Sequence, residues 1–505
     1  MGGTGVELRM QILRDAADQQ ILKPLRSHGW EASVITENTS GEYIVIEANR
    51  SNAVHKIALL YSSATSNGHY KDLDRVVEHI FTNGELYRIE SYAYGINAKV
   101  TPIDDFFPLL VQWNKGIAPP GEPARKAPSR PRNRAIRHIT AETPIDGIWA
   151  RLDQFASRQL AEKLVLRRAQ EESIVLNPSA VQSKASGVAY AIRNASDYFR
   201  SLPFESLNKR TLSLYYGVLA LAFAEMLASP RGPTDLDEVE GMTKQGHGLY
   251  TVPSVAGDLG GINVGVLASG FFPRWVTFLG HDTAKFPKAK PKTPSDIEKL
   301  APGTASTFGA LLASIPELGD LFLEVFDLPP SWVVPEFGFD VNSGHYGGKR
   351  RASEPDSTYI QLIDPSKRIT DETVRAAGWP IAEVTAVPED EHGRAFQVRV
   401  DHAGYTYWHE ALPIHHSPFD QRPTLIVPVL AGISEYRAIA TSILYTLSIL
   451  VRYMPSVWRR VEGGDWDQHL AMIKAAVAAF ERVLPEEFLE SIIGERINAR
   501  QPGTL

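Results

Sequence analysis

The sequence predicts an α+β protein of several domains, in which a small α/β domain precedes a mostly α-helical module that contains a β-rich insert. Three observations predict this class. Strand-like runs lie between two helical patterns in the first 115 residues. A stretch rich in proline and arginine follows them. Long apolar segments with helical spacing dominate the rest of the chain, except for a strand-rich stretch at residues 331–428.

Residues 1–115 are expected to form the α/β domain. Apolar residues at three- and four-residue spacing predict one helix over 5–26 and a second over 70–81. Runs of β-branched and aromatic residues between turn signals predict strands. These strands are expected at 30–36, 42–48, 55–62 and 86–94. The expected order is therefore α-β-β-β-α-β.

Residues 116–143 are expected to be a basic, proline-rich linker, because prolines stiffen the chain and cannot donate backbone hydrogen bonds. Six basic residues follow Glu122 without an intervening acid. They are Arg125, Lys126, Arg130, Arg132, Arg134 and Arg137. Two interpretations stay open: a tether that binds nucleic-acid phosphates, or a soluble connector with no ligand.

Two segments, 144–330 and 429–505, are expected to form the helical module, and residues 331–428 the β-rich insert between them. Helical patterns cover 149–170, 179–199, 212–228, 307–313, 318–326, 435–453 and 466–483. Strand patterns in the insert cover 359–363, 382–387 and 396–400. The helices over 212–228 and 435–453 are almost uniformly apolar, so we expect them to be buried and to pack on each other.

Composition excludes several classes of protein. The chain has 505 residues and no cysteine, which rules out disulfides, thiol catalysis and thiolate metal sites. Its net charge of −7 is too small to attract nucleic acid over the whole surface, so a basic patch would be local. No secretory signal is expected, and no apolar run reaches the ~20 residues of a membrane span. We therefore expect a cytoplasmic protein with no membrane partner.

Several separated segments, in order, resemble the YaaC-like family of bacterial proteins. The residues that carry the resemblance lie at Ala189–Phe199, Thr211–Leu227, Gly246–Leu249, Ile315–Leu318 with Leu321-Phe322, and Tyr445–Trp458. The resemblance spans about residues 177–490. It implies a fold but no activity, since no enzymatic activity is established for the family.

The helix pair that contains Tyr215-Tyr216 also looks like the helical bundles of HEPN-type proteins. Many of these are RNases of defence systems, which use an arginine and a histidine four to six residues apart on one helix. Arg193 and Arg452 have no histidine at that spacing, and the fitting pair Arg132 and His138 lies in the linker. The resemblance thus implies a bundle without that RNase site.

The order of elements in the N-terminal domain is similar to the core of PD-(D/E)xK nucleases, in particular the Mrr-like group. Glu7 on the first helix and Glu42 on the second strand are the candidates for two acidic positions of that core. Glu47, in Glu47-Ala48-Asn49 on the second strand, supplies an acid but has asparagine in place of the lysine, and Lys56 on the third strand is the candidate lysine. In such sites carboxylates hold Mg²⁺ and the lysine orients water. The acid-x-lysine motif is absent here, which implies a degraded site; Mg²⁺ is expected only if the nuclease interpretation holds.

Other candidates have two interpretations each. Arg452, at the end of an apolar helix, is either a cap of the last carbonyl groups or a ligand anchor. His402, His409, His415 and His416 are either zinc ligands or surface histidines, and the lack of regular spacing favours the surface. No metal site is therefore expected from them.

Two hypotheses for function follow. The first is a non-catalytic factor that binds nucleic acid or a protein partner, in bacterial stress or phage defence. The second is a Mg²⁺-dependent nuclease with an atypical active site.

Overall fold

The computed structural model is about 49% helical and 20% strand. It divides into two compact units, Met1–Arg125 and Lys126–Leu505, and the division falls inside the predicted linker. The structure describes the whole chain apart from residues 1–2, 51–52, 117–135, 203–204, 255–256, 329, 337–338, 341–344, 347–348, 352–353, 391–392, 406, 421 and 504–505.

The N-terminal unit is built on a five-stranded sheet in the order β1-β2-β3-β4-β5. The first three strands are antiparallel, and β4 and β5 continue the sheet in parallel with β3. The strands are β1 (Glu31–Glu37), β2 (Tyr43–Arg50), β3 (Ala53–Leu60), β4 (His79–Thr82) and β5 (Lys99–Pro102).

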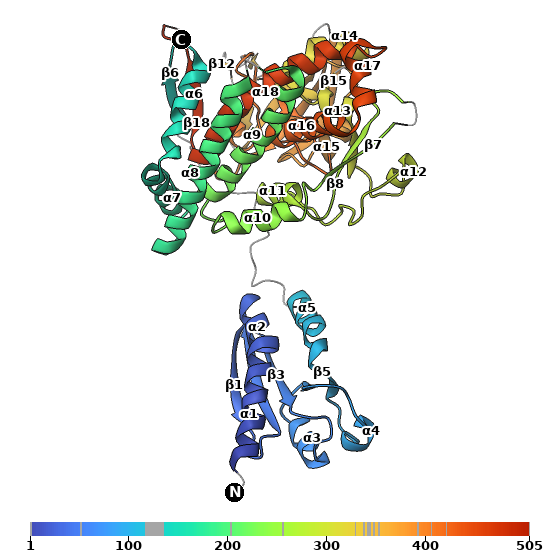
Figure 1. The fold of residues 1–505 in the computed structure, drawn as a ribbon. Helices are drawn as coiled ribbons and strands as arrows, with labels where there is room; N and C mark the ends of the chain where they lie inside the picture. The colour runs from blue at the N-terminus through green and yellow to red at the C-terminus, as the bar shows by residue number, and fades with distance from the viewer. Residues whose placement is uncertain are drawn as a thin grey trace. The chain divides into compact units, whose positions relative to one another are not determined.

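Helices cover both faces of this sheet (Figure 1). On one face, α1 (Gly3–Ala17), its continuation through η1 (Asp18–Leu22) and α2 (Lys23–Ser27), and α5 (Phe106–Gly116) share a core with Ile44 and Ile46 of β2. On the other face, α3 (Asn67–Leu73) packs on Val45. Successive side chains of β2 therefore enter different cores, as the period of a strand requires.

The second helix and last strand predicted in this unit are misplaced. The helix ends at Leu73, and residues 79–82 form β4, where Ile80 and Phe81 are fully buried in the sheet. A short apolar run does not distinguish a helix from a central strand. Residues 86–94 form no strand and contain the one-turn helix α4 (Ile89–Tyr92). The order α-β-β-β-α-β is nevertheless present over residues 3–82.

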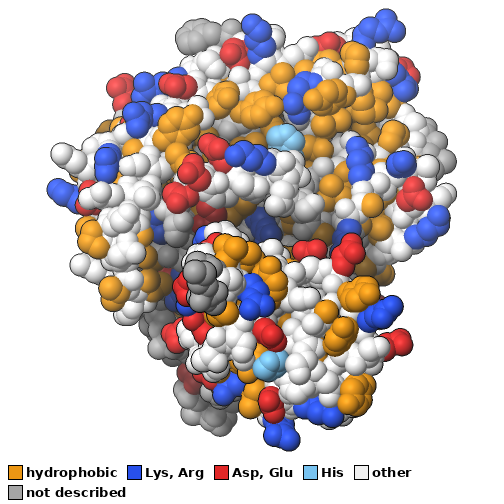
Figure 2. Space-filling model, turned by 60° about the horizontal axis from the view of Figure 1, so that its bottom comes forward, with side chains coloured by type: hydrophobic (Ala, Val, Ile, Leu, Met, Phe, Trp, Pro, Cys, Tyr) orange, Lys and Arg blue, Asp and Glu red, His pale blue; other side chains and the backbone are white. Residues whose placement is uncertain are grey.

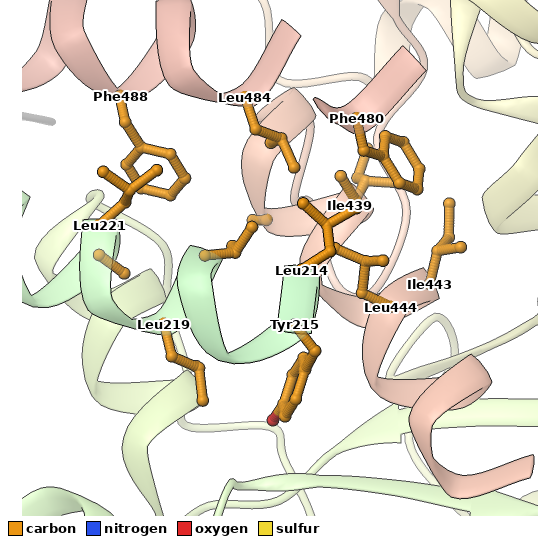
Figure 3. Packing of buried hydrophobic residues seen from close by; sticks show 14 of the residues in the cluster. Leu214, Tyr215, Leu219, Leu221, Ile439, Ile443, Leu444, Phe480, Leu484 and Phe488 are labelled. Atoms are coloured by element: carbon orange, nitrogen blue, oxygen red, sulfur yellow. The ribbon is translucent and has the colours of Figure 1, made fainter. Parts of the chain in front are cut away.

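The C-terminal unit is a helical assembly with α9 (Leu207–Ala228) at its centre. It packs against α8 (Pro178–Ser201), α16 (Tyr436–Tyr453) and α18 (Gln468–Ile493) (Figure 1). Figure 3 shows Leu221 against Phe488 of α18, and Leu214 beside Ile439 of α16. The predicted contact between the two apolar helices is confirmed.

Small residues allow α8 and α9 to approach closely. A Cβ atom added at Gly217 would lie 2.8 Å from the ring of Phe199, and one added at Gly187 would lie 2.8 Å from Leu227. By length and composition α9 could cross a membrane, and the pair α16 and α17 (Pro455–Gly463), bent by 105°, would be a second candidate if it formed one span. In α9, 78% of the most apolar window is buried inside the protein, as expected of a core helix.

The remaining helices frame this core. The predicted helix over 149–170 is broken at η3 (Gln154–Ala156) into α6 (Pro144–Asp153) and α7 (Arg158–Glu171). The others are α10 (Leu236–Lys244), α11 (Phe271–Phe278), α12 (Pro294–Ile297), α13 (Phe308–Ala313), α14 (Gly319–Phe326) and α15 (Asp371–Ala376).

The predicted β-rich insert forms a sheet in the order β15-β16-β14-β10-β17, with β13 (Lys349–Arg351) also paired to β14. All three predicted strands of the insert lie within this sheet. Its main strands are β10 (Trp332–Glu336), β14 (Glu354–Asp364), β15 (Ile381–Asp390), β16 (Gly393–Asp401) and β17 (Leu425–Ile426).

Three smaller sheets complete the unit. The sheet β7-β8-β9 consists of β7 (Leu249–Val252), β8 (Asn263–Val266) and β9 (Ala305–Thr307), and β11 (Phe339–Asp340) pairs with β12 (His345–Tyr346). The third joins β6 (Ile136–Thr140) in parallel to β18 (Arg496–Arg500), so residues 136–140 belong to this unit.

A chain of buried charges connects the insert to the helices. Glu225 of α9 pairs with Arg437 at 2.7 Å, and Arg437 lies 3.6 Å from Glu487 of α18. Glu487 contacts His415 Nδ1 at 3.0 Å, and Glu317 contacts His415 Nε2 at 2.8 Å. These contacts join α9, α16 and α18 to Glu317, which precedes the insert, and to His415, in the C-terminal part of the insert.

Of the four candidate histidines, His415 and His402 are buried, at 4% and 1% exposure, where surface positions were favoured. His416 is exposed, as expected. Both ring nitrogens of His415 are occupied by carboxylates, and His402 shares a hydrogen bond of 2.9 Å with Thr358. No group of three potential metal ligands occurs in the described part of the chain.

We expect His415 to make stability depend on pH. Burial opposes its protonation, but the hydrogen bonds and charges of Glu317 and Glu487 outweigh burial and raise its pKa to about 10. Because this folded-state value lies above the ~6.5 of an unfolded chain, the stabilisation is complete below pH ~6.5 and is lost as pH rises through about 10. His415→Asn should lower the free energy of unfolding by about 3–5 kcal/mol near neutral pH.

The measurement is urea unfolding of the parent and the His415→Asn variant across this pH range. The difference between the two should shrink toward alkaline pH. His28→Asn, at an exposed histidine, serves as the control and should show no such trend. A difference for His415→Asn that stays constant with pH would contradict the assignment of the charge to His415.

Candidate functional site

The nuclease candidates Glu47 and Lys56 are direct cross-strand partners on β2 and β3. Lys56 Nζ lies 3.2 Å from Glu47 Oε2, and the Asn49 side-chain amide donates to Glu47 Oε1 at 3.2 Å. The hydrogen bonds from Asn49 and Lys56 lower the pKa of Glu47. The carboxylate is therefore satisfied by its neighbours as an ordinary cross-strand ion pair.

The other two nuclease candidates lie apart from this pair. Glu7 projects from α1, is 76% exposed, and lies 3.6 Å from Arg14. Glu42 precedes β2 and lies 3.2 Å from His69. Because α1 packs on the face of the sheet opposite to Glu47, the sheet separates Glu7 from Glu47 and Lys56. The structure brings together only two of the four predicted residues.

The predicted basic tether lies largely outside the described residues, namely Arg125, Lys126, Arg130, Arg132 and Arg134. The sixth basic residue, Arg137, lies on β6, where Nε donates to Glu495 at 2.5 Å, and Arg167 also pairs with that carboxylate. Arg137 is therefore used to hold β6 beside β18. On the face seen in Figure 2, basic and acidic side chains are interspersed.

Arg452, the predicted ligand anchor, lies in the last turn of α16 and is half-buried. Its Nε donates to the Ser448 carbonyl oxygen and its Nη2 to the Ser448 hydroxyl, both at 3.2 Å. Its Nη1 donates to the Tyr216 hydroxyl at 3.0 Å. Among the described residues no carboxylate lies within 4.0 Å of this guanidinium group, so its charge is not paired there.

Tyrosine rings surround this arginine. The guanidinium carbon lies 6.0 Å from the centre of the Tyr216 ring and 5.0 Å from that of Tyr453. The Tyr198 and Tyr216 rings stack with centroids 6.0 Å apart, and Tyr453 is 68% exposed. We call Tyr198, Tyr216, Arg452 and Tyr453 the tyrosine–arginine patch. It combines stacking surfaces with an unpaired positive charge.

His247 lies beside this patch and was not among the predicted site residues. Its Nδ1 shares a hydrogen bond of 3.0 Å with the buried Tyr215 hydroxyl. Its ring centre lies 6.0 Å from that of Tyr445, whose hydroxyl donates to the Leu249 carbonyl oxygen. Burial, and then the nearby charge of Arg452, lower the pKa of His247. The imidazole is therefore neutral at pH 7.

The loop that carries His247 is fixed by its backbone. Gly246 and Gly248 both have positive φ values, +95° and +79°, which glycine adopts readily. The amides of Phe271 and Phe272 donate to the carbonyl oxygens of Gly246 and His247 at 3.0 and 2.9 Å. The Gly-His-Gly sequence was a signal of this arrangement, but its tyrosine and arginine neighbours come from distant segments.

In a comparison with known protein families, a family model described as YaaC-like Protein matches residues 153–492. This range includes α8, α9, the His247 loop, the insert, α16 and nearly all of α18. No curated protein and no solved structure matches.

The two glycines of the loop provide a matched pair of variants. In Gly248→Ala the new Cβ would lie 2.2 Å from Pro273 Cδ at a positive φ, whereas in Gly246→Ala it would meet no atom within 4 Å. Gly246→Ala should therefore cost only the backbone strain of about 1–2 kcal/mol. Gly248→Ala should cost about 1–3 kcal/mol more, because of overpacking. Equal losses in the free energy of unfolding, measured in urea, would show that the close contact with Pro273 is unimportant.

Proposed function

The chain belongs to the YaaC-like family, and from that membership and the tyrosine–arginine patch we propose that it is a non-catalytic factor that binds single-stranded nucleic acid. A protein partner with anionic groups is the alternative. The proposed setting is the bacterial cytoplasm, in stress or phage defence, and it rests on the resemblance of the helix pair to HEPN-type bundles.

The observation that carries this proposal is that Arg452 is half-buried and its guanidinium has no carboxylate partner in the described part of the chain. A positive charge that is partly removed from water usually has an anionic partner. A phosphate group fits a guanidinium fork by two parallel hydrogen bonds. We therefore infer that the guanidinium group of Arg452 binds an anion that is not part of this chain.

The tyrosines favour nucleic acid over other anions. Proteins that bind single strands combine positive charge with aromatic rings on which bases stack, at about 1–3 kcal/mol per base. Tyr453 offers an exposed ring 5.0 Å from the Arg452 guanidinium carbon, and the stacked Tyr198 and Tyr216 extend the aromatic surface. A base and its neighbouring phosphate could be bound together here.

No specific observation favours the nuclease alternative. Glu47 and Lys56 neutralise each other, Glu7 is separated from them by the sheet, and the described residues contain no group of three metal ligands.

Binding of a fluorescent single-stranded oligonucleotide to the full-length protein tests the proposal. Arg452→Gln should weaken binding about tenfold, since hydrogen bonds to a charged group contribute about 1.5–3 kcal/mol. It should also lower the slope of log affinity against log salt by about 1. Fluorescence anisotropy across a salt series measures both quantities.

Arg459→Gln is the matched control, because Arg459 is an exposed arginine on α17 and the variant makes the same change of charge. It should bind almost as the parent does. Equal affinity of Arg452→Gln and the parent would overturn the proposal. Cleaved oligonucleotide in a parallel reaction with Mg²⁺ would overturn the non-catalytic assignment.

A further inference from the structure

The Tyr215 hydroxyl fixes the proton of His247. This hydroxyl is buried, and its hydrogen-bond partner in the described part of the chain is His247 Nδ1, at 3.0 Å. A buried hydroxyl hydrogen requires an acceptor, and a neutral imidazole accepts at only one nitrogen. When Tyr215 donates to Nδ1, the imidazole proton must be on Nε2. His247 then presents a donor on the side away from Tyr215.

The neighbouring groups also present donors. A guanidinium group has five N–H bonds, and the contacts of Arg452 use one on each of its three nitrogens. One N–H on Nη1 and one on Nη2 remain. The Tyr216 hydroxyl accepts from Arg452, so its own hydrogen is available. Arg452, Tyr216 and His247 together therefore offer donors and one positive charge.

A terminal phosphate fits such a set better than a phosphate within a strand. It has three acceptor oxygens and a charge of about −1.5 to −2 at pH 7. A backbone phosphodiester has two non-bridging oxygens, one charge and a sugar on each side. Arg452 is half-buried, whereas Tyr453 beside it is 68% exposed.

We infer that the site binds a terminal phosphate monoester, with Arg452 and Tyr216 on its oxygens and His247 Nε2 as a further donor. This inference rests on the proposed function and specifies its ligand. The phosphate could belong to the end of a strand or to a free nucleotide, since both carry the same group.

The test uses the full-length protein and one oligonucleotide sequence with a 5′-phosphate, a 3′-phosphate or hydroxyl groups at both ends. One phosphorylated form should bind about tenfold more tightly than the hydroxyl form, as expected for one charge-assisted contact. A mononucleotide and inorganic phosphate serve as competitors. Competition by the mononucleotide at equal concentration would identify a free nucleotide as the source of the phosphate.

The His247→Asn variant tests the contribution of the histidine alone. An asparagine amide keeps an acceptor near the position of Nδ1 for Tyr215 but has no donor at the position of Nε2. The variant should lose most of the preference for the phosphorylated end, measured as the ratio of its affinities for the phosphorylated and hydroxyl oligonucleotides, and its unfolding temperature shows whether it is folded. His247→Gln, whose amide reaches the position of Nε2, should keep part of that preference.

The outcomes separate the inference from the proposed function. If none of the oligonucleotides binds, the proposed function fails. If all three bind equally and phosphate does not compete, nucleic-acid binding stands and the inference fails. If the preference for a phosphorylated end persists in His247→Asn, the role assigned to His247 is wrong.

Discussion

The burial of α9 is the constraint on which the rest of the C-terminal unit depends. This helix is apolar around most of its circumference, so a single neighbour cannot cover it. Three helices pack over it: α8, which is close in sequence, and α16 and α18, which lie more than 200 residues further along the chain. The chain must therefore return to α9 after the insert. This requirement fixes the two points at which the chain leaves the helical core and rejoins it.

The two ends of α9 then acquire different roles. Near its C-terminal end Glu225 is buried and needs compensation, which Arg437 of α16, Trp275 of α11 and Ser491 of α18 provide. A buried ion pair such as Glu225 with Arg437 adds little to the free energy of unfolding compared with apolar packing. Removal of one partner nevertheless lowers the free energy of unfolding strongly, because the other charge stays buried and unpaired. Through Glu487 and His415 the same chain of charges extends to the C-terminal part of the insert and connects it to the helices.

Nearer its N-terminal end α9 carries Tyr215 and Tyr216, adjacent residues with different surroundings. Tyr215 is buried and orients His247, whereas Tyr216 is half-buried and orients Arg452. The packing of α9 in the core therefore positions both His247 and Arg452, the two residues of the proposed phosphate site that these tyrosines orient. The proposed site is therefore preorganised by the core of the C-terminal unit.

The sequence by itself determined the class of fold, the long helices, the β-rich insert and the family, because apolar periodicity and segment order are local or linear properties. Only the tertiary structure decided that residues 79–82 are a strand, that His415 is buried between two carboxylates, and that His247 lies beside Arg452. The physical reason is that each of these depends on partners from distant segments. A short apolar run becomes a strand only where a sheet accepts it, and a histidine or arginine acquires its charge state and its function from the groups that folding brings against it.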